Sequence, residues 1–173
     1  MRDLVPDYWR WESEPRALVG YGQHHAETVQ TRADVFDSQS RSGNPYFTIY
    51  DVTDSVLAPV GISLILVDDR TRTGELIIIL GAEGRGKRLA AEAIRMTVDY
   101  GFHITNLRNI WLSVLAPNVA GIRAYEQAGF KPIGRRRNSG HWLGAIVDHV
   151  FMDTIPADFP GPSLVKRMLE PGL

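Results

Sequence analysis

Hydrophobic positions in the first half of the chain follow the two-residue period of β-strands. The segment NPYFTIYDV (residues 44–52) alternates and is rich in aromatic and β-branched residues, as half-buried strands are. Two apolar runs follow, VGISLILVDD (60–69) and GELIIILG (74–81), each bounded by turn residues. The link DDRTRTG (68–74) has the composition of a hairpin turn. The pattern therefore predicts consecutive antiparallel strands.

The period changes after this region. The segment 87–102 carries apolar residues at helical spacing along one stripe, namely Leu89, Ala93, Met96 and Tyr100. Gly101 suits the end of such a helix, because glycine adopts the left-handed conformation found there. We expect a helix over this segment.

Strands and helices then alternate to the end of the regular pattern. Residues 109–116 predict a strand, and a second helix is expected between Asn118 as N-cap and Gly129 as C-terminal stop. Two more strands are predicted at 132–137 and 145–155. This order favours an α/β fold with a mixed, mostly antiparallel sheet flanked by helices and with parallel pairing near its centre.

Both ends of the chain are harder to interpret. The first 42 residues look irregular, with aromatic residues and prolines, and only residues 26–39 have a helical pattern. From Pro156 the sequence is proline-rich, and we expect a surface tail over 156–173. No repeat or linker divides the 173 residues, so we predict a single domain with its core at 44–155.

Composition narrows the function classes. The net charge is −1, which argues against nucleic acid or membrane surfaces as partners. The chain has no cysteine, so disulfides, thiolate metal sites and cysteine nucleophiles are excluded. The adjacent His24 and His25 would point in opposite directions in an extended segment, and we expect no metal site. No apolar run is long enough to cross a bilayer, and we expect a cytoplasmic protein.

The stretch LGAEGRGKRLA (80–90) joins a predicted strand to a predicted helix. Its glycines allow a tight turn that brings backbone N–H groups close to an anion, and the helix N-terminus adds unpaired N–H donors. Arg85, Lys87 and Arg88 add positive charge. The loop therefore suits a phosphate group, although a glycine turn with solvated basic residues and no ligand would have the same sequence pattern.

Two motifs resemble the GNAT superfamily of N-acyltransferases. The loop is similar to the family's acyl-CoA pyrophosphate loop, [RQ]-x-x-G-x-[GA], with Arg85 at its first position, Arg88 at the glycine position and Ala90 at its last. The segment 118–130 is similar to N-x-x-[SA]-x-x-x-Y-x-x-x-G-F. The sequences of both motifs and of DHVFMDTI (148–155) are most similar to those of the branch that contains the ribosomal-protein alanine N-acetyltransferases.

The resemblance implies a fold, a co-substrate and a set of residues. The family's fourth and fifth strands, here 75–80 and 109–116, splay apart and admit the pantetheine arm of acetyl-CoA. The implied acetyl-CoA-binding residues are Ile79, Leu80, Arg85, Gly86, Lys87, Arg88, Leu89, Ala90 and Asn118. Backbone N–H groups near Ile79 and Leu80 would polarise the acyl carbonyl, and the first 42 residues would form the acceptor side.

Acetyl transfer to an amine also needs proton donors and acceptors. The resemblance makes Tyr125 the general acid for the departing thiolate, because a phenol is protonated at neutral pH. Glu75 is the candidate general base, although a glutamate at the start of a strand is more often simply solvated. Four residues are candidates for contacting the acceptor amine: His141, Trp142, Asp148 and His149.

We expect an N-acetyltransferase that acts on a primary amine of a small molecule or a protein N-terminus. An acyltransferase with another donor, such as a longer acyl-CoA or an aminoacyl-tRNA, is the alternative that Arg88 suggests. A non-catalytic acyl-CoA-binding module is a third interpretation. The acceptor and the oligomeric state, including a homodimer, are left open.

Overall fold

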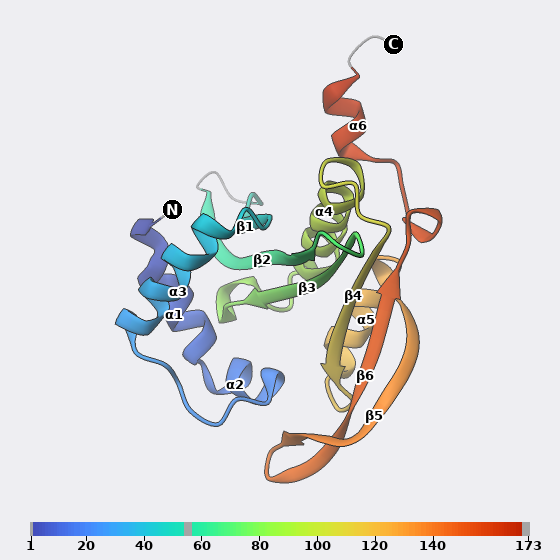
Figure 1. The fold of residues 1–173 in the computed structure, drawn as a ribbon. Helices are drawn as coiled ribbons and strands as arrows, with labels where there is room; N and C mark the ends of the chain where they lie inside the picture. The colour runs from blue at the N-terminus through green and yellow to red at the C-terminus, as the bar shows by residue number, and fades with distance from the viewer. Residues whose placement is uncertain (1, 54–56, 171–173) are drawn as a thin grey trace.

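A single six-stranded sheet organises the protein. The computed structural model describes residues 2–53 and 57–170. The strands are β1 (Tyr46–Asp51), β2 (Ala58–Asp68), β3 (Thr73–Leu80), β4 (Asn109–Leu115), β5 (Lys131–Trp142) and β6 (Ala145–Thr154). Their order in the sheet is β1-β2-β3-β4-β6-β5, and only β3 and β4 pair in parallel (Figure 1). The predicted fold class is confirmed.

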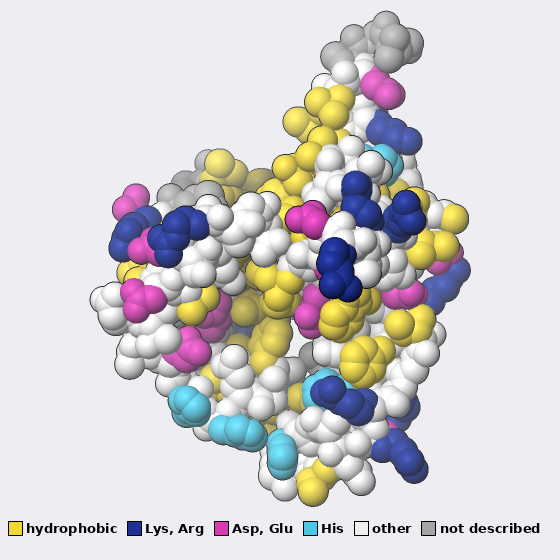
Figure 2. Space-filling model, in the orientation of Figure 1, with side chains coloured by type: hydrophobic (Ala, Val, Ile, Leu, Met, Phe, Trp, Pro, Cys, Tyr) yellow, Lys and Arg dark blue, Asp and Glu magenta, His cyan; other side chains and the backbone are white. Residues whose placement is uncertain are grey.

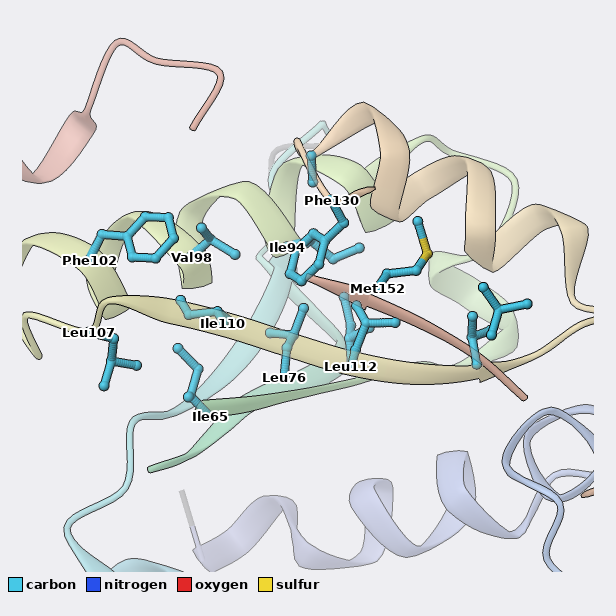
Figure 3. Packing of buried hydrophobic residues seen from close by; sticks show 14 residues of the cluster. Ile65, Leu76, Ile94, Val98, Phe102, Leu107, Ile110, Leu112, Phe130 and Met152 are labelled. Carbon is cyan, nitrogen blue, oxygen red and sulfur yellow. The ribbon is translucent and has the colours of Figure 1, made fainter. Parts of the chain in front are cut away.

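Two helices cover one face of the sheet. They are α4 (Leu89–His103) and α5 (Val119–Gln127). Alternate residues of the strands point toward them and pack against Ile94 and Val98 of α4, as Figure 3 shows with Leu76, Ile110 and Met152. A leucine-sized side chain buried in this way contributes about 1.5–3 kcal/mol, so the main core fixes the helices on the sheet. The stripe predicted from the sequence is not the buried face of α4, because Met96 on that stripe is 52% exposed.

The other face is covered by the N-terminal segment, which is helical and not irregular. It forms η1 (Arg2–Leu4), α1 (Val5–Ser13), α2 (Pro15–Tyr21) and α3 (Val29–Ser42) (Figure 1). The helical pattern predicted at 26–39 is confirmed by α3. The prediction of irregular structure before it was wrong, because the prolines lie in the first turns of α1 and α2, where proline is tolerated. Tyr8 and Trp11 are fully buried in a second, smaller core.

Gly101 does not end its helix. It lies inside α4, which continues to His103, and it is buried. A Cβ atom at Gly101 would lie 2.7 Å from Ile110 Cδ1 and 2.8 Å from Ile65 Cδ1. The glycine is therefore needed for close packing of α4 on the sheet, and the expected role as a helix terminator is wrong.

The C-terminal residues return to α4. After η3 (Pro156–Asp158) the chain forms the short helix α6 (Leu164–Leu169), which projects from the body in Figure 1. The buried carboxylate of Asp99 on α4 accepts hydrogen bonds from the Ser163 hydroxyl (2.6 Å) and from the amides of Leu164 (2.7 Å) and Val165 (3.1 Å). These bonds anchor the start of α6.

The parallel pair β3–β4 separates after three residues. Thr73, Gly74 and Glu75 pair with residues 109–111, and no further pair follows along the two strands. The remaining residues of β3, up to Leu80, continue to pair with β2, while β4 continues to pair with β6. The predicted splay is present, and the fork begins beyond Glu75.

No helix among residues 2–53 and 57–170 is long and apolar enough to cross a membrane.

Candidate functional site

The glycine loop leaves β3 on one side of the fork. It contains the single 3₁₀ turn η2 (Ala82–Gly84), and Gly86 adopts a left-handed conformation with φ 75°. The following helix α4 begins at Leu89, and its N-cap, Arg88, makes no side-chain capping bond. Backbone N–H groups in the first turn of a helix have no acceptor within the helix. The loop therefore leads into a 15-residue helix whose N-terminus is uncapped.

Arg88 also has a left-handed backbone, with φ 62°. This conformation costs a residue with a Cβ atom roughly 1–2 kcal/mol and costs glycine almost nothing. The turn into α4 thus explains why glycine suits this position. The side chain of Arg88 is exposed, so it does not fill the turn.

Carboxylates from other elements hold the loop. Glu14 lies 2.7 Å from the Arg85 guanidinium, and its other oxygen accepts the Ala82 amide at 3.3 Å. Asp51, at the end of β1, lies 2.7 Å from the Lys87 ammonium. This ion pair, with a hydrogen bond from Thr53, holds the pKa of Asp51 well below its usual range. The loop is fixed from both flanks before any ligand binds.

These features fit a diphosphate. The uncapped amides at Leu89 and Ala90 and the positive end of α4 favour an anion. Arg85 and Lys87 bring positive charge to the loop, where they pair with Glu14 and Asp51, and Arg88 is exposed to solvent. The fork of β3 and β4 lies next to the loop and exposes strand edges to an extended arm. Coenzyme A has both parts.

Tyr125 lies on α5, on the other side of the fork. It packs against the main core, with its ring 6.0 Å from that of Phe130. Its hydroxyl has no hydrogen-bond partner among the described residues. The hydroxyl oxygen is not fully buried, so a substrate can reach it. Burial raises its pKa to about 12. Asn118 caps α5 by accepting the Gly121 amide at 3.0 Å, as predicted.

Glu75 lies at the fork itself. It forms the last β3–β4 pair, with Trp111, before the strands separate. Burial raises its pKa, and no hydrogen-bond donor in the described residues satisfies its carboxylate. By strand alternation its side chain shares a face with Ile77 and Ile79. A carboxylate with a raised pKa is closer to the range in which a general base works.

A cavity of about 260 Å³ lies on that same face, between β3 and the N-terminal helices. It is lined by Trp9, Glu12, Ser13, Tyr21, Gln23, Glu27, Arg32, Val35, Ile77 and Ile79. Glu12 lies 2.8 Å from the buried Arg32 guanidinium. Burial and the negative charge of Glu27 raise the pKa of Glu12, although Arg32 opposes the shift. Figure 2 shows the surface hollowed between the N-terminal helices and the β4–β6 half.

Tyr21 connects the cavity to Tyr125. Its pKa is raised by burial, although 42% of the residue is exposed, and also by the neighbouring Tyr125 and Glu12. Electrostatic influence of this kind requires the groups to lie near one another. Tyr21 therefore lines the acceptor-side cavity and lies within electrostatic range of the tyrosine expected to act as acid.

The predicted acceptor residues lie on the β5–β6 hairpin, away from the lining of the cavity. Asp148 accepts the Asn138 amide at 3.0 Å and lies 3.5 Å from Arg135. His149 Nδ1 lies 2.8 Å from the Ser139 hydroxyl, and burial, with Arg136 nearby, lowers its pKa. These contacts order the bulge in β5.

The other two hairpin residues lie near its tip. His141 is exposed, and its ring lies 5.5 Å from that of His24 in the loop before α3. Trp142 is half-buried at the end of β5. Neither residue is among the cavity's lining residues. Within the described ranges, no group of three potential ligands is placed to hold a metal ion.

Sequence reasoning missed the cavity because eight of its ten lining residues belong to the N-terminal segment. That segment has no motif, and its apolar residues are spread over three short helices. The aromatic residues were the available signal. Of these, Trp9 and Tyr21 line the cavity, whereas Tyr8 and Trp11 belong to the core.

Comparison with known families places this architecture. Residues 2–131 match the model of the acetyltransferase (GNAT) domain. The chain belongs to this family. The match confirms the resemblance found in the sequence, and it extends into the N-terminal helices that the sequence motifs did not cover.

Relatives of this GNAT protein include enzymes named spermidine N(1)-acetyltransferase. Spermidine N(1)-acetyltransferase of Escherichia coli K12 is 31% identical over 111 residues, 61% of this chain and 60% of that enzyme. The chain thus matches about three fifths of the length of that relative. An uncharacterized N-acetyltransferase, p20 of Bacillus licheniformis, is 27% identical over 92% of this chain and 89% of its own length.

Solved structures confirm the fold. A spermidine N-acetyltransferase from Vibrio cholerae, in complex with CoA and spermine, superposes with a TM-score of 0.84 at 20% identity, over 93% of this chain and 95% of that one. A ribosomal-protein-alanine N-acetyltransferase from Brucella melitensis gives a TM-score of 0.76 at 15% identity, over 90% and 96%. The branch expected from the sequence is therefore among the structural neighbours.

Proposed function

We propose that this protein transfers the acetyl group of acetyl-CoA to a primary amine of a small molecule. One observation carries the proposal: β3 and β4 separate beyond Glu75, between an uncapped helix N-terminus and a cavity on the opposite side of the sheet. A thioester placed in the fork could be reached by an amine entering from the cavity.

The donor would be held by backbone groups. The amides of residues 85–90 and the charges of Arg85 and Lys87 suit the diphosphate. The pattern of strand bonds supports Leu80 over Ile79 as the group that polarises the acyl carbonyl. The Gly81 amide donates to Val60 on β2, so by antiparallel alternation the Ile79 amide also points to β2. The Leu80 amide then points to the open side of the fork.

Two side chains would move protons. The incoming ammonium must lose a proton, and we assign its removal to Glu75, directly or through a water molecule. The neutral amine nitrogen then attacks the thioester carbon, the carbon–sulfur bond breaks, and the thiolate takes a proton from Tyr125. The second proton of the attacking nitrogen is lost as the amide forms and returns to the Tyr125 phenolate, directly or through a water molecule. Burial raises the pKa of Tyr125 to about 12, which keeps the phenol protonated but makes it a weaker acid. Burial would also raise the pKa of the thiolate, which reduces the difference between donor and acceptor.

The acceptor we propose is a polyamine-like cation. The relatives named for spermidine suggest it, and the cavity carries Glu12 and Glu27, of which only Glu12 has an arginine partner in the described residues. A carboxylate without a cationic partner attracts an ammonium group. The hairpin residues His141, Trp142, Asp148 and His149 stay candidates for the outer part of the acceptor path.

The test combines binding and turnover. We expect CoA to bind in calorimetry and to raise the melting temperature, and acetyl-CoA to be consumed with spermidine or another member of an amine panel. Mass spectrometry of the product with acetyl-CoA and longer acyl-CoAs identifies the donor. CoA binding without turnover on the whole panel would favour a non-catalytic module. Size-exclusion chromatography on the same sample distinguishes a monomer from a homodimer.

A further inference from the structure

Glu14 stands at the junction of two helices and touches the donor loop. It follows the last residue of α1 and is the N-cap of α2, with the rigid Pro15 next to it. One carboxylate oxygen lies 2.7 Å from the Arg85 guanidinium, and the other accepts the Ala82 amide at 3.3 Å. Both side chains of the Glu14–Arg85 pair are largely buried, with 21% and 28% exposure.

A second carboxylate reinforces the same attachment from the side of the loop. Glu83 of η2 accepts the Trp11 indole N–H at 2.7 Å and lies 2.7 Å from the Arg10 guanidinium on α1. Gly81 approaches the same indole so closely that a Cβ atom would lie 2.2 Å from Trp11 Cδ1. The C-terminal half of α1 is therefore fixed against residues 81–85.

The same helices form the wall of the acceptor-side cavity. Trp9, Glu12 and Ser13 line it from α1, and Tyr21 lines it from the end of α2. Ser13 precedes Glu14 directly in the sequence, and α2 is only seven residues long. A change at Glu14 therefore reaches both the cavity wall and Tyr21 through a short, proline-started helix.

We propose that Glu14 is a positioning residue that couples the two substrate sites, so that a diphosphate bound at Arg85 orders α2 and the acceptor-side cavity. The inference rests on the proposed function, because it requires that CoA occupies the loop. A ligand that restrains Arg85 also restrains the carboxylate paired with it, and the rigid Glu14–Pro15 step passes this restraint to α2. Coupling between two sites in proteins is typically about 5- to 150-fold.

Amide hydrogen exchange of residues 15–23, with and without saturating CoA, measures this coupling in the absence of any acceptor. In the wild-type protein we expect CoA to slow exchange in α2 at least five-fold. In Glu14→Ala, at CoA concentrations that saturate its own weaker affinity, we expect no slowing. Glu14→Gln keeps an acceptor for the Ala82 amide but loses the ion pair, and it should give partial protection.

Asp69→Asn is the matched control, because it removes one exposed carboxylate in the β2–β3 turn far from the loop. It should behave as the wild type does. Two results would overturn the coupling and leave the proposed function intact. One is that CoA slows amide exchange in α2 equally in Glu14→Ala and in the wild type. The other is that CoA does not slow this exchange in a wild-type protein that binds CoA and turns over. A wild-type protein that binds no CoA would overturn both.

Discussion

The role of Tyr125 can be tested by removing a single oxygen atom. Tyr125→Phe keeps the ring that packs against Phe130 and the main core. The hydroxyl that is lost has no hydrogen-bond partner among the described residues and is not fully buried, so its removal leaves no buried polar group without a partner. We expect the free energy of unfolding to change by no more than about 0.5 kcal/mol.

Turnover should respond very differently. A positioned general acid contributes about 10²–10⁴-fold to a rate, which corresponds to about 2.7–5.4 kcal/mol of transition-state free energy. The Tyr125 hydroxyl acts as the general acid and is not part of the diphosphate site. The dissociation constant for CoA should therefore stay within about two-fold of the wild-type value. The predicted signature is therefore a large loss of kcat with unchanged folding and donor binding.

Initial rates of CoA release, followed with a thiol-reactive dye, measure kcat with the acceptor amine at saturation. Calorimetry with CoA and a chemical denaturation curve provide the two controls on the same sample. A kcat within three-fold of wild type, with intact folding, would remove Tyr125 from the mechanism. The thiolate would then leave without a protein acid or take its proton from another group.

Three further substitutions test the rest of the structure. Burial raises the pKa of Glu75, so kcat/KM should rise with pH through that raised value. Glu75→Gln should abolish this rise and lower kcat about 10²–10⁴-fold. It should not lower stability at neutral pH, because the charge that it removes disfavours the folded state above the unfolded pKa. Burial raises the pKa of Asp99, but hydrogen bonds from Ser163 and the amides of Val165 and Leu164 outweigh it and leave that pKa lowered. The stabilisation that Asp99 provides should be complete above the unfolded pKa of about 3.9 and disappear as pH falls through the folded pKa. In urea titrations, Asp99→Asn should lose about 2–3 kcal/mol of unfolding free energy at pH 7 and should no longer show this dependence on acid. Gly101→Ala should cost about 1–3 kcal/mol in the same titration, because its Cβ would overlap Ile110 and Ile65; an unchanged midpoint would show that α4 can move away from the sheet.

The core of the fold could be predicted from the sequence because each of its elements has a local signal. The strands at 60–69 and 74–81 are continuous apolar runs, and β2 buries six of its 11 residues and β3 four of its eight. The helix that follows the glycine loop was predicted from its helical spacing, but its buried face, with Ile94 and Val98, lies beside the predicted stripe, on which Met96 is 52% exposed. The fork came from family resemblance alone, since nothing in the strand residues themselves requires β3 and β4 to separate.

The acceptor side could not be predicted for a physical reason. Of its helices only α3 shows a helical pattern in the sequence. The nine residues of α1 and the seven of α2 are too few to show a clear period, and large side chains such as Tyr8 and Trp11 hold α1 in place. The polar residues that matter most there, Glu14 and Glu83, act by contacts between segments 68 or more residues apart. No pattern within one segment reveals a contact of that kind.

Arg88 shows how a departure from a family pattern is resolved by backbone geometry. In the sequence, an arginine at the glycine position suggests a side chain that blocks the diphosphate turn. The backbone at Arg88 nevertheless adopts the left-handed conformation that glycine would adopt, and the side chain is exposed. The cost is about 1–2 kcal/mol of backbone strain, which the packing of α4 on the sheet can offset. The substitution thus changes the charge at the mouth of the loop and leaves its course intact, so Arg88 by itself gives no reason to replace CoA with another donor.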